Sequence, residues 1–362
     1  MIYLDYQATT PLAPEVRTAM EPWQDEKFAN PHAPYRAGRE AAVAIEIARN
    51  QVMETLGRDT GTLAFTGSAT ESLNWAIRGI LPEQRAHIVT LATEHAAVLD
   101  TVAFAGRRHD VTVLPVETDG IVDLDRVKSA LRPDTALVAA MLVNNEIGVI
   151  QPVAEIAAIA HEAGALMLCD AVQGLGRVPI PEGPDMIAVC AHKIHGPKAI
   201  GALWLGDGVT PEPLIHGGGQ EKGMRSGTLS PALCAGFGMA AQLARQRFEK
   251  DRAHVESLWE IARTILSDWH LNGSVDHRYH GNLNLRREGL DAARLFADHR
   301  DIAFSLGSAC ASGSGRPSHV LRALGLSDRE ARSSIRLGFG RYTDPDRFAD
   351  ALRQLDQSAK KQ

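Results

Sequence analysis

The 362-residue sequence has few cysteines, and none of the four stands at metal-binding or redox-pair spacing from another: Cys169, Cys190, Cys234 and Cys310. A Cys-x-x-Cys zinc or redox motif is therefore excluded, and a chain of this length does not need disulfide staples. The first three lie in apolar or small-residue segments, where cysteine packs as a small hydrophobe. Cys310 lies instead in SLGSACASGSGRPS, a stretch that can supply little core, so we expect an exposed and mobile thiol there.

The sequence also lacks a long apolar run and an excess of positive charge. No segment approaches the roughly 20 apolar residues that a membrane-spanning helix needs. The formal net charge of -6 argues against a sequence-independent grip on nucleic-acid phosphates. The first 14 residues have no basic segment followed by an apolar stretch, so they do not resemble a signal peptide. We expect a cytoplasmic protein that contacts neither membranes nor nucleic acid directly.

Short apolar runs alternate with helical patterns through the first two-thirds of the chain. This alternation predicts an α/β fold with a mostly parallel sheet covered by helices on both faces. The predicted strands are 62–65, 87–91, 112–116, 136–143, 166–169, 186–189 and 202–205, and the predicted helices between them are 71–79, 97–105, 124–131 and 153–162.

The character of the sequence changes near Pro231. A long helical stretch to about His270 is followed by predicted strands at 282–285, 302–305 and 334–339 and by a closing helix. We therefore predict a large domain over 15–249 and a smaller α+β domain formed by 1–14 and 250–362, with the N-terminal segment packed against the latter.

Three segments that follow predicted strands carry candidate chemistry, because ligands of such sheets bind at the carboxyl ends of the strands. The first, Phe65 to Ser72 (FTGSATES), has small residues before a helix, an arrangement that binds phosphate at the helix N-terminus. The same residues can simply form a helix cap. Alone, this segment does not decide between the two interpretations.

The second segment ends an apolar strand with Asp170, and Gln173 follows three residues later. A buried carboxylate needs a partner, which could be an arginine, a helix N-terminus or a protonated pyridine nitrogen. In the third segment, Lys193 and His192 follow another apolar strand. Lys193 could extend to solvent or, if desolvated, form a Schiff base with an aldehyde. Together, the three segments form a coherent set for pyridoxal 5'-phosphate.

The chain resembles the NifS/IscS family of cysteine desulfurases, which are fold type I pyridoxal-phosphate enzymes of the class V aminotransferase group. The resemblance spans nearly the whole length and rests on ordered motifs: YLDYQATTP (3–11), TEHAAVLD (93–100), VNNEIGVIQP (143–152), AHKIHGPK (191–198), HGGGQEKGMRSGT (216–228), GSACAS (307–312) and SSIR (333–336). It implies that the chain takes sulfur from L-cysteine, releases L-alanine and holds the sulfur as a persulfide.

The resemblance also implies roles for individual residues around the cofactor. Lys193 holds the cofactor covalently and removes the Cα proton, while Asp170 pairs with the pyridine nitrogen and Gln173 with the phenolic oxygen. His95 stacks on the ring and moves protons. The phosphate is bound by residues at several positions, one of them supplied by the partner subunit of a homodimer: Ala69, Thr70, Cys190, His192 and, from the partner, Thr228.

For the substrate, the resemblance implies that Arg336 binds the carboxylate, that Asn145 lies beside cofactor and substrate, and that Cys310 is the nucleophile that accepts the sulfur. It further implies a sulfur-acceptor protein, such as an iron–sulfur scaffold or a carrier of another thiolation pathway. No metal site is predicted, apart from a transient contact that the Cys310 persulfide could make with an iron–sulfur cluster.

The chain departs from the family pattern at two places near the phosphate. Family members usually carry serine where this chain has Cys190, and a thiol is a weaker hydrogen-bond donor than a hydroxyl. The usual Ser-Gly order is reversed at Gly67-Ser68. We expect the first change to affect cofactor affinity and the second to have little effect, since both residues are small.

Other interpretations remain open from the sequence. Taken singly, His95 could be a histidine of the core, and Arg336 could be the partner in a structural ion pair. The glycine run at 217–219 could be a plain loop. Within the same fold, the chain could be a selenocysteine lyase or another lyase or aminotransferase, which would not strictly need Cys310. A protein of another class, a catalytically silent interaction module, would bind no pyridoxal phosphate and would be colourless.

Overall fold

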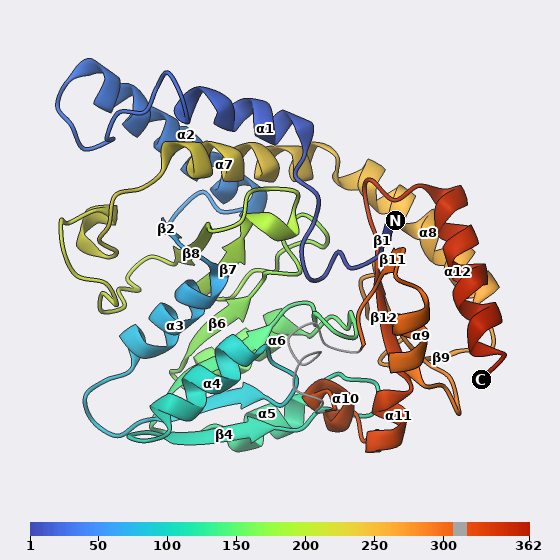
Figure 1. Ribbon diagram of the computed structural model, residues 1–362. Helices are drawn as coiled ribbons and strands as arrows, with labels where there is room; N and C mark the ends of the chain where they lie inside the picture. Colours follow the sequence, from blue (N-terminus) through green and yellow to red (C-terminus); the bar gives the residue numbers. More distant parts are fainter. Residues whose placement is uncertain (307–316) are drawn as a thin grey trace.

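The computed structural model describes residues 1–306 and 317–362, and a seven-stranded sheet forms the centre of its larger part (Figure 1). The strand order is β2-β8-β7-β6-β5-β3-β4, and only β8 runs antiparallel to its neighbours. The strands are β2 (Thr62–Thr66), β3 (His87–Leu91), β4 (Asp110–Leu114), β5 (Thr135–Met141), β6 (Leu166–Asp170), β7 (Met186–Cys190) and β8 (Gly201–Leu205).

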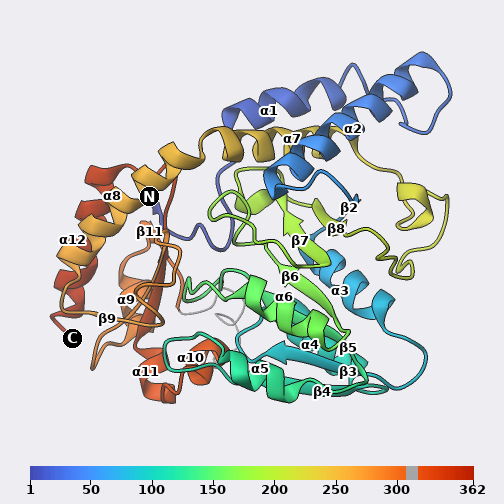
Figure 2. The ribbon, with the colours of Figure 1, turned by 180° about the vertical axis from the view of Figure 1, so that it is seen from behind.

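Helices cover both faces of this sheet, as Figures 1 and 2 show from opposite sides. On one face, α3 (Ala69–Ile80) and α4 (Ala96–Ala105) bury an apolar cluster that includes Trp75 and Val98. The other face packs on a larger cluster with side chains from α2 (Arg36–Leu56), α5 (Leu124–Ala130), α6 (Val153–Glu162) and α7 (Pro231–Gln246). The short α1 (Pro14–Met20) packs against α7. Burial on both faces explains why the strands are continuous apolar runs.

The predicted mostly parallel α/β sheet is confirmed, together with all seven strands and the four helices between them. The largest shift is in β4, predicted at 112–116 and observed at Asp110–Leu114, where burial is incomplete and the apolar pattern is therefore weaker. The elements α1 and α2 were not predicted from the sequence. Three short 3-10 helices were not predicted either: η1 (Glu21–Trp23), η2 (Ala191–Lys193) and η3 (Glu221–Gly223).

A second, antiparallel sheet has the order β12-β10-β9 and lies in the C-terminal third. Its strands are β9 (His270–Leu271), β10 (Asn282–Arg286) and β12 (Ser334–Gly338), and it shares an apolar core with α8 (Phe248–Ile265), α9 (Ala292–Asp298) and α12 (Pro345–Ala359). The single helical stretch predicted from 231 to 270 is wrong. It is two helices, α7 and α8, separated at Arg247, whose φ of -104° and ψ of 4° are not helical.

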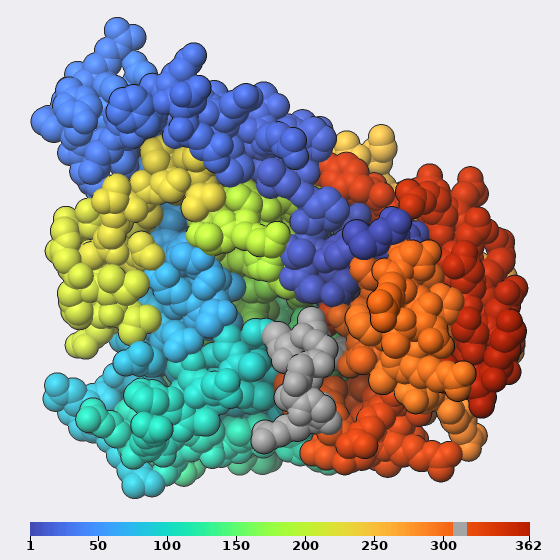
Figure 3. Space-filling view, in the orientation of Figure 1, coloured from blue at the N-terminus to red at the C-terminus, as the bar shows by residue number. Residues whose placement is uncertain are grey.

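The N-terminal segment joins the two cores. β1 (Ile2–Tyr3) pairs with β11 (Ile302–Ala303), and Leu4 belongs to the second core, whereas Ala13 belongs to the first. The predicted packing of this segment on the C-terminal part is thus confirmed, and Figure 3 shows it in dark blue against orange. Two helices of the C-terminal part contribute to the first core instead: α10 (His319–Ala323) and α11 (Asp328–Arg332). The domain division at 249 and 250 stays a prediction.

This topology places the carboxyl ends of β5, β6 and β7 side by side at one edge of the large sheet, facing the C-terminal part. The loops that leave these strands therefore meet the N-terminal segment between the two cores. Within residues 1–306 and 317–362, no helix is both long and apolar enough to cross a bilayer.

Candidate active site

A cavity of about 580 Å³ opens at the carboxyl ends of the central strands, between the two cores. It brings together most of the residues predicted from the sequence to bind the cofactor and the substrate. They come from the start of α3, from the ends of β6 and β7, and from three separate loops or strands: Ala69, Thr70, His95, Asn145, Asp170, Gln173, Cys190, His192, Lys193 and Arg336.

Lys193 ends η2, directly after β7, and its amine is held by the N-terminal segment. Nζ donates to the carbonyl oxygen of Ala8 at 2.8 Å and to that of Gln7. Both acceptors are neutral, and burial lowers the pKa of Lys193 to about 8. Of the two possibilities that the sequence left open, the desolvated lysine is the one observed. An amine with this pKa is neutral often enough near pH 8 to attack an aldehyde or accept a proton.

Asp170 is the last residue of β6, and its carboxylate lies in the cavity with 6% of the residue exposed. Oδ1 accepts the backbone N–H of Val172 at 3.0 Å. Burial raises the pKa of this carboxyl. A buried carboxylate without a cationic hydrogen-bond partner is costly, so the site is suited to a ligand that brings a proton or a positive charge.

The opposite end of the cavity is formed by the N-terminus of α3. Ser68 is the N-cap and accepts the N–H of Glu71 at 3.2 Å, so the segment from Phe65 to Ser72 does form the helix cap considered above. The first N–H groups of a helix have no intrahelical partner, and those of Ala69 and Thr70 border the cavity. A cap and an anion site are therefore compatible here. Gly201 of β8 makes this geometry possible, because a Cβ there would lie 2.5 Å from the carbonyl carbon of Ser68.

Cys190 and His192 complete this end of the cavity. Burial raises the pKa of the Cys190 thiol to about 12, so it is uncharged and can offer an anion only a weak S–H donor. Burial also lowers the pKa of His192 to about 4, and its Nδ1 lies 3.2 Å from the Thr9 hydroxyl. A neutral His192 can hydrogen-bond a phosphate but adds no positive charge near pH 7.

His95 is the N-cap of α4, and its ring borders the cavity. Nδ1 accepts the backbone N–H of Ala97 at 3.1 Å, which leaves the proton of the neutral ring on Nε2. The ring is thus fixed in orientation and tautomer by the start of its own helix. This placement is not that of a core histidine, the alternative considered from the sequence.

Arg336 of β12 is only 1% exposed and reaches the cavity from the second sheet. Its guanidinium donates to Asp5 Oδ1 at 2.7 Å, to the Asn145 carbonyl at 3.0 Å and to Ser305 Oγ at 3.1 Å. The structural ion pair considered from the sequence is therefore real. The Nε atom is buried without an acceptor, so the side chain retains capacity for an added anion.

Several residues that shape the cavity were not singled out from the sequence. The carbonyls of Gln7 and Ala8 are backbone groups, which a side-chain pattern does not reveal, although both residues lie in the quoted 3–11 motif. Glu146 accepts a hydrogen bond from Ser318, and His319 Nε2 donates to the Glu94 carbonyl at 2.9 Å. Glu146 lies in the 143–152 motif, whereas nothing in the sequence marks His319.

Among the described residues, one predicted residue does not line this cavity. Thr228 is exposed and does not border it, so the chain does not bring this threonine to its own site. Cys310 lies outside the described residues. The predicted roles of both residues stay predictions.

The donor set fits pyridoxal phosphate in three respects. The N-terminus of α3 suits the phosphate, Asp170 suits a protonated ring nitrogen, and Lys193 is an amine that can bind the aldehyde. Gln173 borders the same cavity, and its Nε2 donates to the Gln7 carbonyl at 2.9 Å. Among the described residues, no group of three or more His, Cys, Asp or Glu side chains is arranged to hold a metal ion.

Comparisons with known proteins agree with this donor set. The family model for class V aminotransferases matches residues 2–348. The chain is 44% identical over 357 residues to a cysteine desulfurase IscS of Rickettsia peacockii, covering 94% of this chain and 87% of that protein. Among solved structures, a NifS-like protein superposes with a TM-score of 0.91 at 30% identity over 99% of both chains. SspA in complex with cysteine superposes with a TM-score of 0.86 at 36% identity, over 95% of this chain and all of the other.

We predict that the thiol at position 190 weakens the binding of the phosphate. We expect Cys190→Ser to tighten pyridoxal-phosphate binding by about tenfold, because a hydrogen bond to a charged acceptor contributes ~1.5–3 kcal/mol. The dissociation constant, measured by titrating cofactor-free protein, checks this. Cys234→Ala, a change in a buried cysteine of α7 away from the cavity, is the matched control. An unchanged affinity in Cys190→Ser would contradict a phosphate contact at this position.

The lowered pKa of Lys193 predicts the pH dependence of cofactor uptake. Only the neutral amine attacks an aldehyde, so the rate constant for pyridoxal-phosphate binding should rise with pH and level off above about 8. Stopped-flow absorbance of cofactor-free protein mixed with pyridoxal phosphate between pH 6 and 10 measures it. A rate still rising steeply near the ordinary lysine pKa would mean that the amine is solvated.

Proposed function

The chain belongs to the class V aminotransferases, among the cysteine desulfurases, and from this premise we propose that it takes sulfur from L-cysteine and passes it through a persulfide on Cys310. The observation that carries the proposal is the meeting of Lys193, Asp170 and Arg336 in one cavity. A buried amine, a buried carboxylate and a buried guanidinium from three elements match an amino-acid substrate bound beside pyridoxal phosphate.

Pyridoxal phosphate supplies an electron-withdrawing ring that stabilises negative charge at the Cα of an amino acid. The residues of the chain prepare the substrate for this. The Arg336 fork binds the carboxylate of L-cysteine, with Asn145 beside it. Lys193 accepts the Cα proton on Nζ, and Asp170 keeps a proton on the ring nitrogen. His95 would stack on the ring and, with its proton on Nε2, would return a proton to the substrate.

The sulfur step is assigned to Cys310. Its thiolate forms an S–S bond with the substrate sulfur while the Cβ–S bond of the substrate breaks. The electron pair of the broken bond remains with the carbon, which takes up a proton, and the product is L-alanine. The persulfide then gives its outer sulfur to an acceptor protein of iron–sulfur assembly or of another thiolation pathway.

We expect Cys310→Ala to abolish persulfide formation and to reduce alanine release from L-cysteine by at least a hundredfold, because no thiolate then removes the sulfur. Mass spectrometry of the intact protein after reaction and an alanine assay measure the two effects. Cys234→Ala is the control and should match the unmodified protein. Alanine release that persists in Cys310→Ala would favour the selenocysteine-lyase alternative, and trapping of mixed disulfides on Cys310 would identify the acceptor.

A homodimer is part of the proposal. Thr228 is exposed at the end of the 216–228 loop, away from the cavity of its own chain, which supports supply of its hydroxyl to the phosphate of a partner. Each subunit would then bind one cofactor, and each cofactor site would contain residues from both chains.

Subunit mixing tests this arrangement. Thr228→Val should weaken pyridoxal-phosphate binding about tenfold through loss of one charge-assisted hydrogen bond. A mixed dimer pairs a chain that carries Thr228→Val with a chain that carries Lys193→Ala. If each threonine serves the partner's site, the intact lysine and the intact threonine meet in the site of the Thr228→Val chain. We expect normal affinity at that site, measured by titration of the purified mixed dimer. Weak binding there would mean that the threonine acts within its own chain, and an unchanged affinity of the dimer in which both chains carry Thr228→Val would mean that it takes no part.

A further inference from the structure

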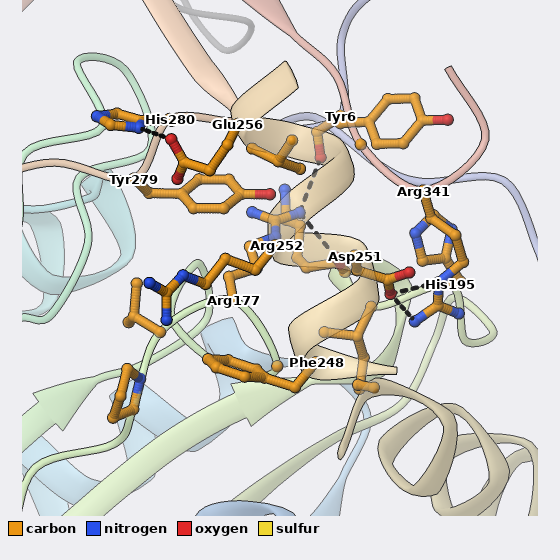
Figure 4. Close-up of a pocket in the computed structure, with 18 of the residues that line it drawn as sticks. Tyr6, Arg177, His195, Phe248, Asp251, Arg252, Glu256, Tyr279, His280 and Arg341 are labelled. Carbon is orange, nitrogen blue, oxygen red and sulfur yellow. Dashed lines mark hydrogen bonds and ion pairs between the residues drawn. The ribbon is translucent and has the colours of Figure 1, made fainter. Parts of the chain in front are cut away.

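A second cavity, of about 210 Å³, is also lined by Lys193. The side chains of Tyr6, Arg177, His195 and Tyr279 surround it, and α8 closes it (Figure 4). Lys193 borders both cavities. A residue of the second cavity that contacts Lys193 can therefore influence the amine without touching cofactor or substrate.

Arg177 is such a residue. Its guanidinium donates to the Lys193 carbonyl at 2.8 Å, to the Tyr6 carbonyl at 3.3 Å and to Oε1 of Gln173. Its guanidinium carbon also lies 5.4 Å from the centre of the Tyr279 ring. The three hydrogen-bond acceptors are neutral oxygens, so dipoles and an aromatic ring surround this positive charge.

The contact with Gln173 decides which way that amide faces. An arginine can only donate hydrogen bonds, so it fixes Oε1 on its own side. The Nε2 group must then point the other way, where it donates to the Gln7 carbonyl at 2.9 Å and borders the large cavity. A donor on that side is what a ligand oxygen on the cofactor ring requires. Without Arg177, only the Gln7 carbonyl would hold the amide in this orientation.

The contact with Lys193 fixes the backbone from which the amine extends. The same guanidinium places a positive charge on the buried side of Lys193, and this charge opposes a second positive charge on Nζ. Burial is the main cause of the lowered pKa of Lys193, and Arg177 adds to it in the same direction. One side chain thus acts on both the lysine and the glutamine of the cofactor site.

We infer that Arg177 is a positioning residue for this reaction, holding Gln173 in its donor orientation, fixing the backbone of Lys193 and placing a positive charge beside it. The inference rests on the proposed function. It assigns to the second cavity a role in tuning the chemistry of the first. The competing explanation is that Arg177 only ties the N-terminal segment to the large sheet through Tyr6.

Three variants of the cofactor-loaded protein separate these explanations. Arg177→Gln removes the charge, Arg177→Lys keeps it, and Arg252→Gln is the matched control, since Arg252 borders the same cavity with 62% of its side chain exposed. The measurements are the pH midpoint of the cofactor's visible absorption change and the kcat and KM for L-cysteine.

We expect the pH midpoint of Arg177→Gln to rise by about one unit, because a neighbouring positive charge no longer opposes protonation. Its kcat should fall roughly tenfold with KM unchanged, since Arg336 and not Arg177 borders the substrate. Arg177→Lys should restore the midpoint, and Arg252→Gln should match the unmodified protein. A midpoint and a kcat in Arg177→Gln equal to those of Arg252→Gln would overturn the inference.

A crystal structure of the unmodified protein with its cofactor tests the inference without any variant, should Arg177→Gln not fold. Bonds from Arg177 to Gln173 Oε1 and to the Lys193 carbonyl would support it, and a guanidinium turned away from both would overturn it. Its failure is distinct from failure of the proposed function. If the unmodified protein binds pyridoxal phosphate but releases no alanine from L-cysteine, the function is wrong, whereas the pH midpoints still test Arg177.

Discussion

The desolvation of one lysine amine is the constraint on which the site depends. Lys193 is held by two carbonyls of the N-terminal segment, and that segment is fixed at its start by pairing with β11 in the C-terminal part. The large sheet alone would leave the amine open to water, without the burial that lowers its pKa. The cavity therefore becomes reactive only when both cores have folded around the first ten residues.

The charges of the cavity are arranged for a ligand with alternating polarity. The helix N-terminus of α3 favours an anion at one end, Asp170 favours a cation in the middle, and Arg336 favours a carboxylate near the second sheet. Each group is already partly satisfied by the protein, through Val172 for Asp170 and through Asp5 for Arg336. These protein partners lower the cost of burying each charged group, while the residual hydrogen-bonding capacity of each group selects the ligand.

The sequence predicted those parts of the site that are local in the chain. Asp170 and Lys193 each follow a buried strand, and parallel neighbours bring the ends of such strands together, so both could be placed from the pattern of strands alone. Lys193 is held by carbonyls more than 180 residues away, and Asp5 meets Arg336 across 331 positions. Contacts of this kind depend on tertiary structure, and a backbone carbonyl has no side-chain signature.

Other features could not be predicted for different reasons. The helix α2 has a charged exposed face and no side-chain cap, so its start carries no sequence signal. The break between α7 and α8 at Arg247 involves neither proline nor glycine. No sequence motif marks Arg177, and its role is indicated only by its contacts beside the second cavity. Thr228 was placed by family resemblance, and a single chain does not test a role that a partner would complete.

Burial also separates the cysteines by reactivity. It raises the pKa of Cys190 and of Cys234 to about 12 and raises that of Cys169 as well, so these three sulfurs remain thiols near neutral pH. A persulfide forms on a thiolate, and a buried thiol also lacks access to an acceptor protein. The three cysteines within the described residues are thus unsuited to carry sulfur, even though Cys190 borders the cavity itself. Desolvation keeps the Cys190 thiol beside the cavity inert, and the same physical effect lowers the pKa of Lys193.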